Sequence, residues 1–429
     1  MGLHNVSKCG MIVLLFLLSY TSYAQLKQVN SPYSRNGIGS VQATQFSINR
    51  AMGGVATAFR STSNVNFNNP ASYSALKFAT FEIGLEGEGL WLNTSNQSQK
   101  SGNGTPAYLA LGLPVNKHWG MSLGILPYSY LNYDIIDGRY GGSVDTVNYR
   151  FIGNGQVYQV YWGNGWQYKN ISAGVNLSYL FGTYNRQKQI TFPTLENGYD
   201  NIYFSDQQIG GLSWNAGLQY KIKISDKRQI VVGASGNTGL NVNAIKNEWW
   251  QRAVINTNFV NLIDTPSVNE NLEGKIVLPS KYSFGVGYKK GIDLEIDADC
   301  TFENWSEFSN FGKIDSTLQN NMRFNVGMAF VPDARADFRG LSNLLKRSTY
   351  RLGAYYNTGD IKIGNTSLSS YAVTAGFGVP IKRSLSRLNF SLEVGQKGST
   401  NNQLIQETFV IGTVGFTLND RWFIQRKFD

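Results

Sequence analysis

Carboxylates recur at every second position of one short stretch of the chain: Asp293, Glu295, Asp297 and Asp299. In an extended strand, alternate side chains point to the same face, so neighbouring carboxylates lie about 6.5–7 Å apart. Such a row repels itself in a confined space unless cations lie beside it. The pattern therefore indicates either a set of internal ion pairs or a site that binds a cation.

Other charged residues occur at polar positions of further predicted strands: Lys281, Lys289, Arg323, Glu82 and Glu86. We predict that these acids and cations form an internal salt-bridge network. We expect the same network to hold the N-terminal segment through Arg50 or Arg60. A cation-selective or cation-binding lumen is the alternative that the residues leave open.

Catalytic chemistry is not indicated by the sequence. Beyond the leader, the chain has one histidine, His118, and it lies in a predicted turn. A Ser–His or Asp–His hydrolase needs a base in its site. No zinc, nucleotide or calcium pattern is evident. We therefore expect no enzyme activity, no cofactor and no metal.

Residues 1–24 have the form of a secretory signal peptide. Lys8 precedes an apolar run, Met11 to Leu18, and small residues end the segment at Ala24. The run is too short to span a bilayer. We expect cleavage near Ala24 and export of the rest, which retains one cysteine, Cys300, and so has no internal disulfide.

The composition favours an outer-membrane barrel over a soluble exported protein. Tyr and Phe number 24 each and Gly 46, while no later segment has the continuous apolar run of a membrane-spanning helix. The net charge is +10, but the cations are scattered and form no basic stripe. We expect contacts with outer-membrane lipid and lipopolysaccharide phosphates, and no nucleic acid partner.

Period-two alternation dominates the sequence after residue 76. Apolar residues at even positions from Tyr282 to Tyr288 and from Phe324 to Phe330 alternate with small or polar ones. In a sandwich the apolar side would face a core, whereas in a membrane barrel it faces lipid. We predict an all-β fold, an antiparallel transmembrane barrel with fourteen strands: 77–94, 105–113, 118–130, 153–164, 170–190, 203–224, 228–250, 281–288, 292–305, 320–331, 348–357, 369–381, 387–397 and 405–418.

Short and long connections alternate between these strands, as expected for periplasmic turns and extracellular loops. The longest predicted loop, 251–280, has Trp249 and Trp250 at its base and is a candidate contact for a protein partner. One connection, 332–347, lies on the side of the short turns but is itself long. We expect a small periplasmic helix there.

The stretch from Asn49 to Leu76 does not alternate. Just before and within it, Ile48, Met52, Val55 and Phe59 have helical spacing, and Pro70 then interrupts regular structure. We predict a plug inside the barrel and divide the chain into signal peptide (1–24), plug (25–76) and barrel (77–429). An ordinary capping helix on a soluble β-domain is the alternative. The candidate ligand-binding or gating residues are Met52, Val55, Phe59, Asn68, Asn69, Pro70 and Ala71, although an apolar helical stripe is also typical of simple packing.

Two motifs resemble the FadL-like family of outer-membrane transporters of hydrophobic compounds. The run Gly53 to Ala58 leads to Asn69-Pro70-Ala71. The run Leu278 to Tyr288 precedes an acidic strand that ends in Asn304-Trp305-Ser306. The resemblance implies a porin-like, fourteen-stranded barrel with an N-terminal hatch, and a ligand route that leaves through a lateral opening in the wall. Ser72 departs from the glycine that is common there.

Two functions follow from that resemblance, because the family also includes the shuttle barrel of type nine secretion. The first is passage of fatty-acid-like hydrophobic small molecules past the plug, in the outer membrane of a Gram-negative bacterium. The second is a non-transporting adaptor in an outer-membrane assembly or secretion complex, bound to its other subunits. The first requires a continuous apolar cavity and a wall gap, and the second a sealed lumen.

Overall fold

The computed structural model describes residues 31–42, 44–141, 145–193, 198–255, 259–337, 339–382 and 384–421. The predicted signal peptide and its cleavage point lie outside these ranges. Within them, no helix has the length and apolar character needed to cross a membrane. The predicted division of the chain at Ala24 and Leu76 stays a prediction.

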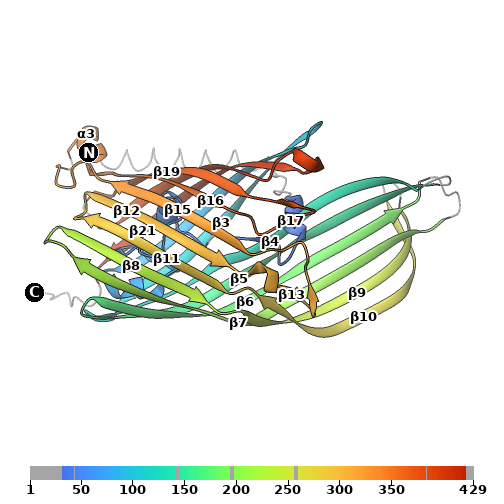
Figure 1. Cartoon of the computed structure of the whole chain (residues 1–429), viewed down its shortest axis with the longest axis horizontal. Helices are drawn as coiled ribbons and strands as arrows, with labels where there is room; N and C mark the ends of the chain where they lie inside the picture. The colour runs from blue at the N-terminus through green and yellow to red at the C-terminus, as the bar shows by residue number, and fades with distance from the viewer. Residues whose placement is uncertain are drawn as a thin grey trace, which may run out of the picture.

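The described chain forms a closed antiparallel barrel (Figure 1). β8 and β9 share one wall position because both pair with β7. β10 pairs with β9 and β11 pairs with β8, so β10 and β11 share the next wall position. The wall therefore has fourteen strand positions, and it closes where β2 pairs with β21. The predicted fold class is confirmed. The wall strands are β2 (Ala79–Asn93), β3 (Ser98–Pro114), β4 (Trp119–Gly141), β5 (Asp145–Tyr168), β6 (Ile171–Thr191), β7 (Asp200–Lys223), β8 (Arg228–Asn237), β9 (Leu240–Ile255), β10 (Val260–Leu278), β11 (Lys281–Lys290), β12 (Leu294–Glu303), β15 (Asn321–Phe330), β16 (Thr349–Asn357), β19 (Ser370–Pro380), β20 (Arg387–Lys397) and β21 (Gln406–Asp420).

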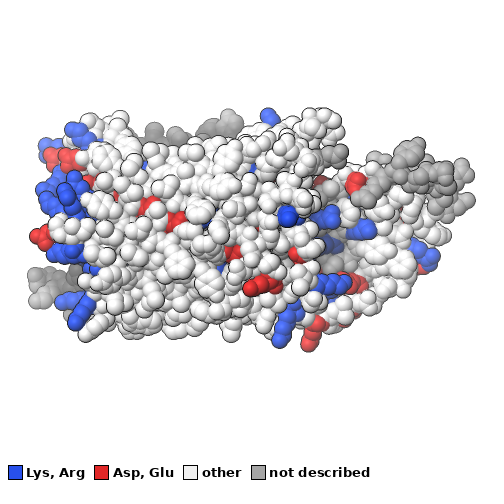
Figure 2. Space-filling model, in the orientation of Figure 1, with Lys and Arg blue, Asp and Glu red and all other residues white. Residues whose placement is uncertain are grey.

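The outer face of the wall is apolar. Leu85, Leu212, Phe284 and Val373 belong to different strands, and each exposes more than half of its side chain. Figure 2 shows charged residues gathered mainly at the two ends of the barrel, with a paler belt between them. This belt is the lipid-facing band of an outer-membrane barrel. The apolar residues of each strand therefore face outward, and the sandwich alternative is wrong.

Two predicted loops are largely strand. The pairing of β4 with β5 runs through most of 131–152, and β10 fills most of 251–280. Polar residues interrupt both faces of these segments, so no alternation of apolar residues is sustained along them. Together with β6, β7 and β9 they extend past the short strands at the long-loop end of the barrel (Figure 1). We call this extension the arm (residues 131–141, 145–155, 184–191, 200–209, 244–255 and 260–275).

The wall strand formed by β10 and β11 is interrupted at Pro279 and Ser280 because proline has no backbone donor for the ladder. The Ser280 carbonyl instead accepts a bond from the Asn304 N–H at 3.0 Å, and the Asn304 amide donates to Ser280 Oγ at 2.7 Å. This contact joins the two ends of the second family-like motif, the run from Leu278 and the Asn304-Trp305-Ser306 element. It also marks the place where the arm leaves the barrel.

The remaining elements are short. α3 (Leu341–Arg347) is the helix that the sequence predicts within 332–347. The N-terminal segment contains η2 (Pro32–Arg35), β1 (Ser40–Val41), α2 (Ser47–Arg50) and η3 (Pro70–Ala75). The loops contain η4 (Trp305–Glu307), β13 (Ser309–Asn310), β14 (Lys313–Ile314), β17 (Lys362–Ile363), β18 (Thr366–Ser367) and η5 (Asn401–Gln403).

Candidate functional site

The N-terminal segment from residue 44 to residue 76 lies inside the barrel, and we call it the plug. The helix expected through Phe59 ends at Arg50, so that prediction is wrong. Gly53 and Gly54 have φ values of 68° and 85°, a left-handed conformation that ends a helix. Ile48, Met52, Val55 and Phe59 are nevertheless all buried. Their spacing therefore reflects burial in a compact turn.

Glycines of the wall allow the plug backbone to lie directly against it. A Cβ atom on Gly327 or Gly353 would lie 2.2 Å from backbone atoms of Met52. At the same place the Gly53 N–H donates to Thr374 Oγ1 at 2.8 Å, and the Asn325 amide donates to the Gly53 carbonyl at 2.8 Å. The plug is thus fixed by backbone hydrogen bonds that a larger wall residue would prevent.

The Asn-Pro-Ala element begins a helix and does not simply interrupt structure. Asn69 accepts a hydrogen bond from the Ala71 N–H at 3.1 Å and so caps η3. Its amide also donates to the Thr57 carbonyl at 2.7 Å, and Asn68 Oδ1 accepts a bond from Thr44 at 2.7 Å. These contacts fix the plug conformation. A role in ligand binding or gating for these residues stays a prediction.

Arg50 is the main charged link between plug and barrel. It is buried, and it pairs with Glu86 at 2.8 Å and with Glu393 at 2.9 Å. Burial alone would lower the pKa of Arg50, but the two carboxylates more than offset it and raise the pKa. The sequence prediction named Glu86 and missed Glu393, because a single acid in an alternating strand gives no distinctive signal.

The acidic ladder on β12 is only partly a salt-bridge network. Glu295 pairs with Lys289 at 2.6 Å. Asp299 accepts bonds from the backbone N–H groups of Ala56 and Thr57 at 2.6 and 2.9 Å. Asp297 is buried, and neither of its oxygens accepts a hydrogen bond from a described residue. The ladder therefore holds the plug mainly through backbone donors.

The remaining predicted charges have separate surroundings. Asp293 lies exposed in the turn before β12, so its inclusion in the interior network is wrong. Lys281 pairs with Glu303 at 3.0 Å, and Arg323 lies 3.8 Å from the Tyr355 ring centroid. Glu82 accepts bonds from the Val65 N–H at 3.0 Å and the Asn64 amide at 3.2 Å.

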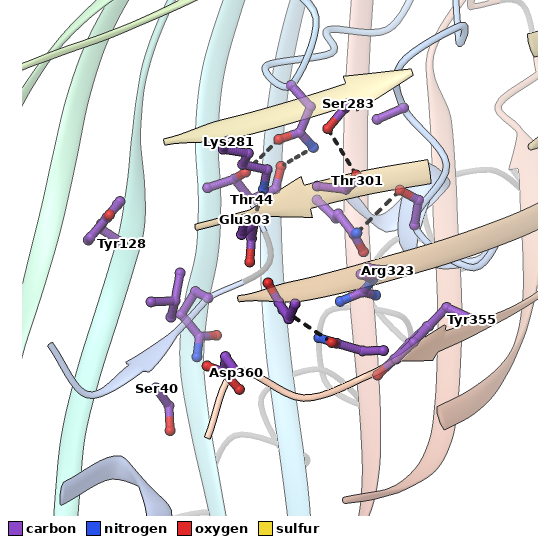
Figure 3. A pocket seen from close by; sticks show the side chains of 18 of the residues that line it. Ser40, Thr44, Tyr128, Lys281, Ser283, Thr301, Glu303, Arg323, Tyr355 and Asp360 are labelled. Atoms are coloured by element: carbon purple, nitrogen blue, oxygen red, sulfur yellow. Dashed lines mark hydrogen bonds and ion pairs between the residues drawn. The ribbon is translucent and has the colours of Figure 1, made fainter. Parts of the chain in front are cut away.

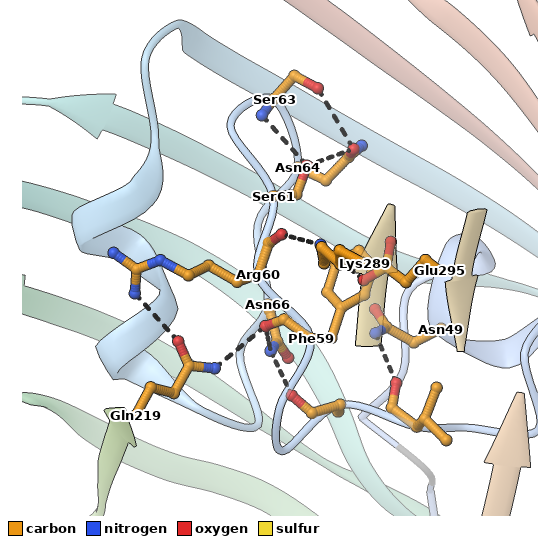
Figure 4. Close-up of polar contacts among 12 residues, drawn as sticks. Asn49, Phe59, Arg60, Ser61, Ser63, Asn64, Asn66, Gln219, Lys289 and Glu295 are labelled. Carbon is orange, nitrogen blue, oxygen red and sulfur yellow. Dashed lines mark hydrogen bonds and ion pairs between the residues drawn. The ribbon is translucent and has the colours of Figure 1, made fainter. Parts of the chain in front are cut away.

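Arg60 anchors the plug without a carboxylate. Its guanidinium donates to Gln167 at 2.6 Å, to Ser172 at 3.0 Å and to Gln219 at 3.1 Å. Burial lowers the pKa of Arg60 to about 10, which keeps it charged at neutral pH. Figure 4 shows Arg60 directed towards Gln219, while Lys289 donates to the Arg60 carbonyl from the other side. Plug and wall are thus joined on both sides of Arg60.

Replacing Asp297 and Asp299 together by alanine is expected to loosen the plug. Two buried N–H groups lose their acceptor, at about 1–3 kcal/mol each. We expect faster protease cleavage of the plug and altered heat-modifiable migration on gels. Asp293→Ala, in the exposed turn, is the matched control. If the double variant retains wild-type migration and wild-type protease resistance, the ladder does not hold the plug.

A polar chamber of about 390 Å³ lies on the loop side of the plug. Figure 3 shows Lys281, Glu303, Arg323 and Tyr355 around it. Six charged residues are among those that line it: Arg50, Glu86, Lys281, Glu303, Arg323 and Glu393. Met52, Val55 and Phe59 do not line this chamber and pack against neighbouring parts of the protein.

A second packed layer bounds the chamber on the loop side, and we call it the lid (residues 31–38, 304–320, 358–369 and 398–405). Tyr33 joins two segments of the lid, because its hydroxyl donates to the Ile405 carbonyl at 2.7 Å and accepts from the Ile405 N–H at 2.9 Å. The lid contributes these buried side chains to one apolar core: Tyr33, Ile38, Trp305, Phe308, Leu318, Ile361, Leu368 and Leu404. The described chamber thus lies between two packed layers.

The wall is incompletely paired at one position. β3 pairs with β4 only from Leu109 to Pro114, although both strands continue further. Beyond that point the free edge of β4 carries β1, with Ser40 opposite Tyr130 and Val41 opposite Ser129. The N-terminal segment therefore covers part of a gap in the wall.

Fold and site together define a class of protein, the outer-membrane barrels of the FadL-like fold. The fold is similar to the toluene transporter TbuX of Ralstonia pickettii (14% identity, 88% of this chain and 99% of that chain, TM-score 0.56). It is also similar to a Pseudomonas aeruginosa FadL homologue (10% identity, 87% of this chain and 98% of that chain, TM-score 0.57). A third similar structure is the Pseudomonas putida toluene transporter TodX (14% identity, 92% of this chain and 100% of that chain, TM-score 0.54). The FadL-like resemblance is therefore confirmed for the fold. None of these three proteins is named as an enzyme.

The family is defined more narrowly by sequence. A family model described as BamG matches residues 6–429, so the chain belongs to the BamG family. No curated protein sequence matches the chain.

Proposed function

We propose that this protein is a structural or adaptor barrel within an assembly of the outer membrane of a Gram-negative bacterium. The observation that carries the proposal is the polar chamber between two packed layers. A hydrophobic molecule that crossed it would bury Arg50, Glu86 and Glu393 against an apolar surface, which is unfavourable. The lumen is better suited to stabilising the barrel than to conducting such a molecule.

The arm supplies a surface for a protein partner. From Val260 to Gly274, β10 pairs on one side with β9 and has no described strand on its other side. An unpaired edge offers backbone donors and acceptors to an incoming strand. Val260, Leu262 and Val268 each expose about half of their side chains there. The edge lies in the segment 251–280 that the sequence indicates as a partner contact.

Purification of the full-length protein from its own membrane in a mild detergent tests the proposal. We expect a protein partner at constant stoichiometry in native mass spectrometry. Val268→Lys on the free edge should reduce the amount of that partner, and Ile136→Lys, on exposed β4, is the matched control. A monodisperse barrel without partner, but with a bound fatty-acid-like molecule, would contradict the adaptor proposal.

Passage of a hydrophobic small molecule is the second candidate, and the incomplete pairing of β3 with β4 favours it. A molecule that entered from the arm could leave sideways into lipid if β1 moved from the edge of β4, without crossing the plug. Met52, Val55, Phe59 and residues 68–71 would then stabilise the closed state. Bound fatty-acid-like molecules in the native mass spectrum are the result expected for this candidate.

A further inference from the structure

The inner face of the arm carries two adjacent rows of residues, and each row crosses the five strands β5, β6, β7, β9 and β10. Phe151, Lys188, Tyr203, Trp250 and Ser267 are consecutive cross-strand partners from β5 to β10. The next row is Gly153, Arg186, Ser205, Glu248 and Asn269. Residues two apart on a strand share a face. Both rows therefore form one surface.

This surface faces the inside of the arm. Arg186 donates from its guanidinium to the Gly37 carbonyl at 3.3 Å, and Tyr184, two residues earlier, donates to the Ile38 carbonyl at 2.8 Å. Both acceptors belong to the N-terminal segment within the barrel. A cavity of about 490 Å³ lies over the rows. It is large enough for two or three sugar units or a short peptide.

The rings of this surface are ordered by one another and by a hydrogen bond. Tyr203 and Trp250 are parallel within 3° at a centroid separation of 5.9 Å. The Trp250 indole donates to Asn201 at 2.8 Å. Such rings keep an apolar body and a polar edge available at fixed positions. The site is therefore formed before any ligand binds.

Lys188 lies at the centre of these rings. Its ammonium is 5.3 Å from the Tyr149 centroid and 5.9 Å from those of Phe151 and Tyr203. No described carboxylate pairs with Lys188 or Arg186, whereas Lys246 nearby pairs with Glu248 at 2.8 Å. Two cations are thus available to an anionic ligand at a site that already contains ordered rings.

We propose that the inner face of the arm binds an anionic saccharide, such as a chain of uronic acid units or the acidic sugars of lipopolysaccharide. The rings would contact the C–H faces of the sugar. Lys188 and Arg186 would bind its carboxylate or phosphate groups, which form strong hydrogen bonds with such cations. Ser205, Ser267 and Asn269 would bond to its hydroxyl groups. This inference does not depend on either candidate function.

Other ligand classes fit this surface less well. A fatty chain would leave Ser205, Ser267 and Asn269 without partners. A peptide recognised through its backbone would need free donors and acceptors. On this face β6, β7 and β9 are paired on both sides, so among the described strands such groups are available only along the outer edges of β4 and β10. A ligand rich in hydroxyl groups uses side chains alone and matches the face itself.

The full-length barrel in a detergent without a sugar head group provides the test. Calorimetric titration with trigalacturonate should show saturable, salt-sensitive binding. Lys188→Gln and Trp250→Ala should each weaken it about tenfold, as expected for the loss of a charge-assisted contact or a ring contact. Trp162→Ala is the matched control, because Trp162 is exposed on β5 outside the arm and does not line the cavity, and it should change the affinity by less than about twofold.

Parallel titrations distinguish the sources and the alternatives. Binding of lipid-free lipopolysaccharide core indicates the lipopolysaccharide of the membrane, and binding of trigalacturonate alone indicates a free polysaccharide. Either result supports the proposal. Equal affinity for neutral maltotriose, binding only of an acidic peptide, or an equal loss in Trp162→Ala and Trp250→Ala would overturn it. Lys188→Gln keeps every ring, so it tests the charge even if Trp250→Ala folds poorly.

Discussion

Replacing Arg50 by methionine is expected to lower the free energy of unfolding by about 3–5 kcal/mol, because it leaves two buried carboxylates without their shared cation. Glu86 is on β2 and Glu393 is on β20, and both approach Arg50 within 3 Å. The change therefore weakens the plug and brings like charges together in the wall. Urea-induced unfolding of the barrel in lipid vesicles, followed by tryptophan fluorescence, measures the loss.

The pair of Arg150 with Asp134 supplies the control for that experiment. Its side chains are 47% and 37% exposed, and Arg150→Met should cost less than about 1 kcal/mol. Adding Glu86→Gln and Glu393→Gln to Arg50→Met should restore part of the lost stability, since no unpaired charge remains. If Arg50→Met unfolds at the same urea concentration as Arg150→Met, Arg50 does not link plug and barrel.

The sequence was sufficient for the fold wherever one face of a strand meets lipid. Period-two alternation predicts where the wall strands lie and how many there are, because every second residue of a strand that faces lipid must be apolar. Alternation does not mark the arm, where polar residues interrupt both faces of strands such as β10, and the sequence therefore predicts a loop at 251–280. The pairing partner β9 determines that β10 is a strand, and pairing is not visible in one segment alone.

The site was predictable in its residue types and less so in its geometry. The β12 acids and Lys289 do lie on one interior face, as their parity predicts. The helix expected from Ile48 to Phe59 ends at Arg50, because Gly53 and Gly54, which the helical spacing leaves out of account, have a left-handed conformation. Glu393 was missed because nothing local distinguishes it. Its importance comes from Arg50, which is more than 340 residues away in the chain.

Replacing Gly353 by alanine is expected to displace the plug without removing any charged group. The new Cβ would lie 2.2 Å from the Gly53 nitrogen and from the Met52 carbonyl carbon. Both are backbone atoms and cannot rotate away, so the plug must move and the bond from the Gly53 N–H to Thr374 is lost. Overpacking of this kind costs about 1–3 kcal/mol. Limited trypsin digestion at Arg50 and Arg60 measures the exposure of the plug.

Gly412 is the matched control for that substitution, because a Cβ atom there meets no atom within 4 Å. Gly412→Ala should keep the wild-type digestion rate, while Gly353→Ala should be cut severalfold faster within an otherwise folded barrel. The comparison separates steric exclusion from the general effect of alanine in a strand. If both variants resist trypsin equally, the close approach of the plug backbone at Gly353 does not hold the plug in place.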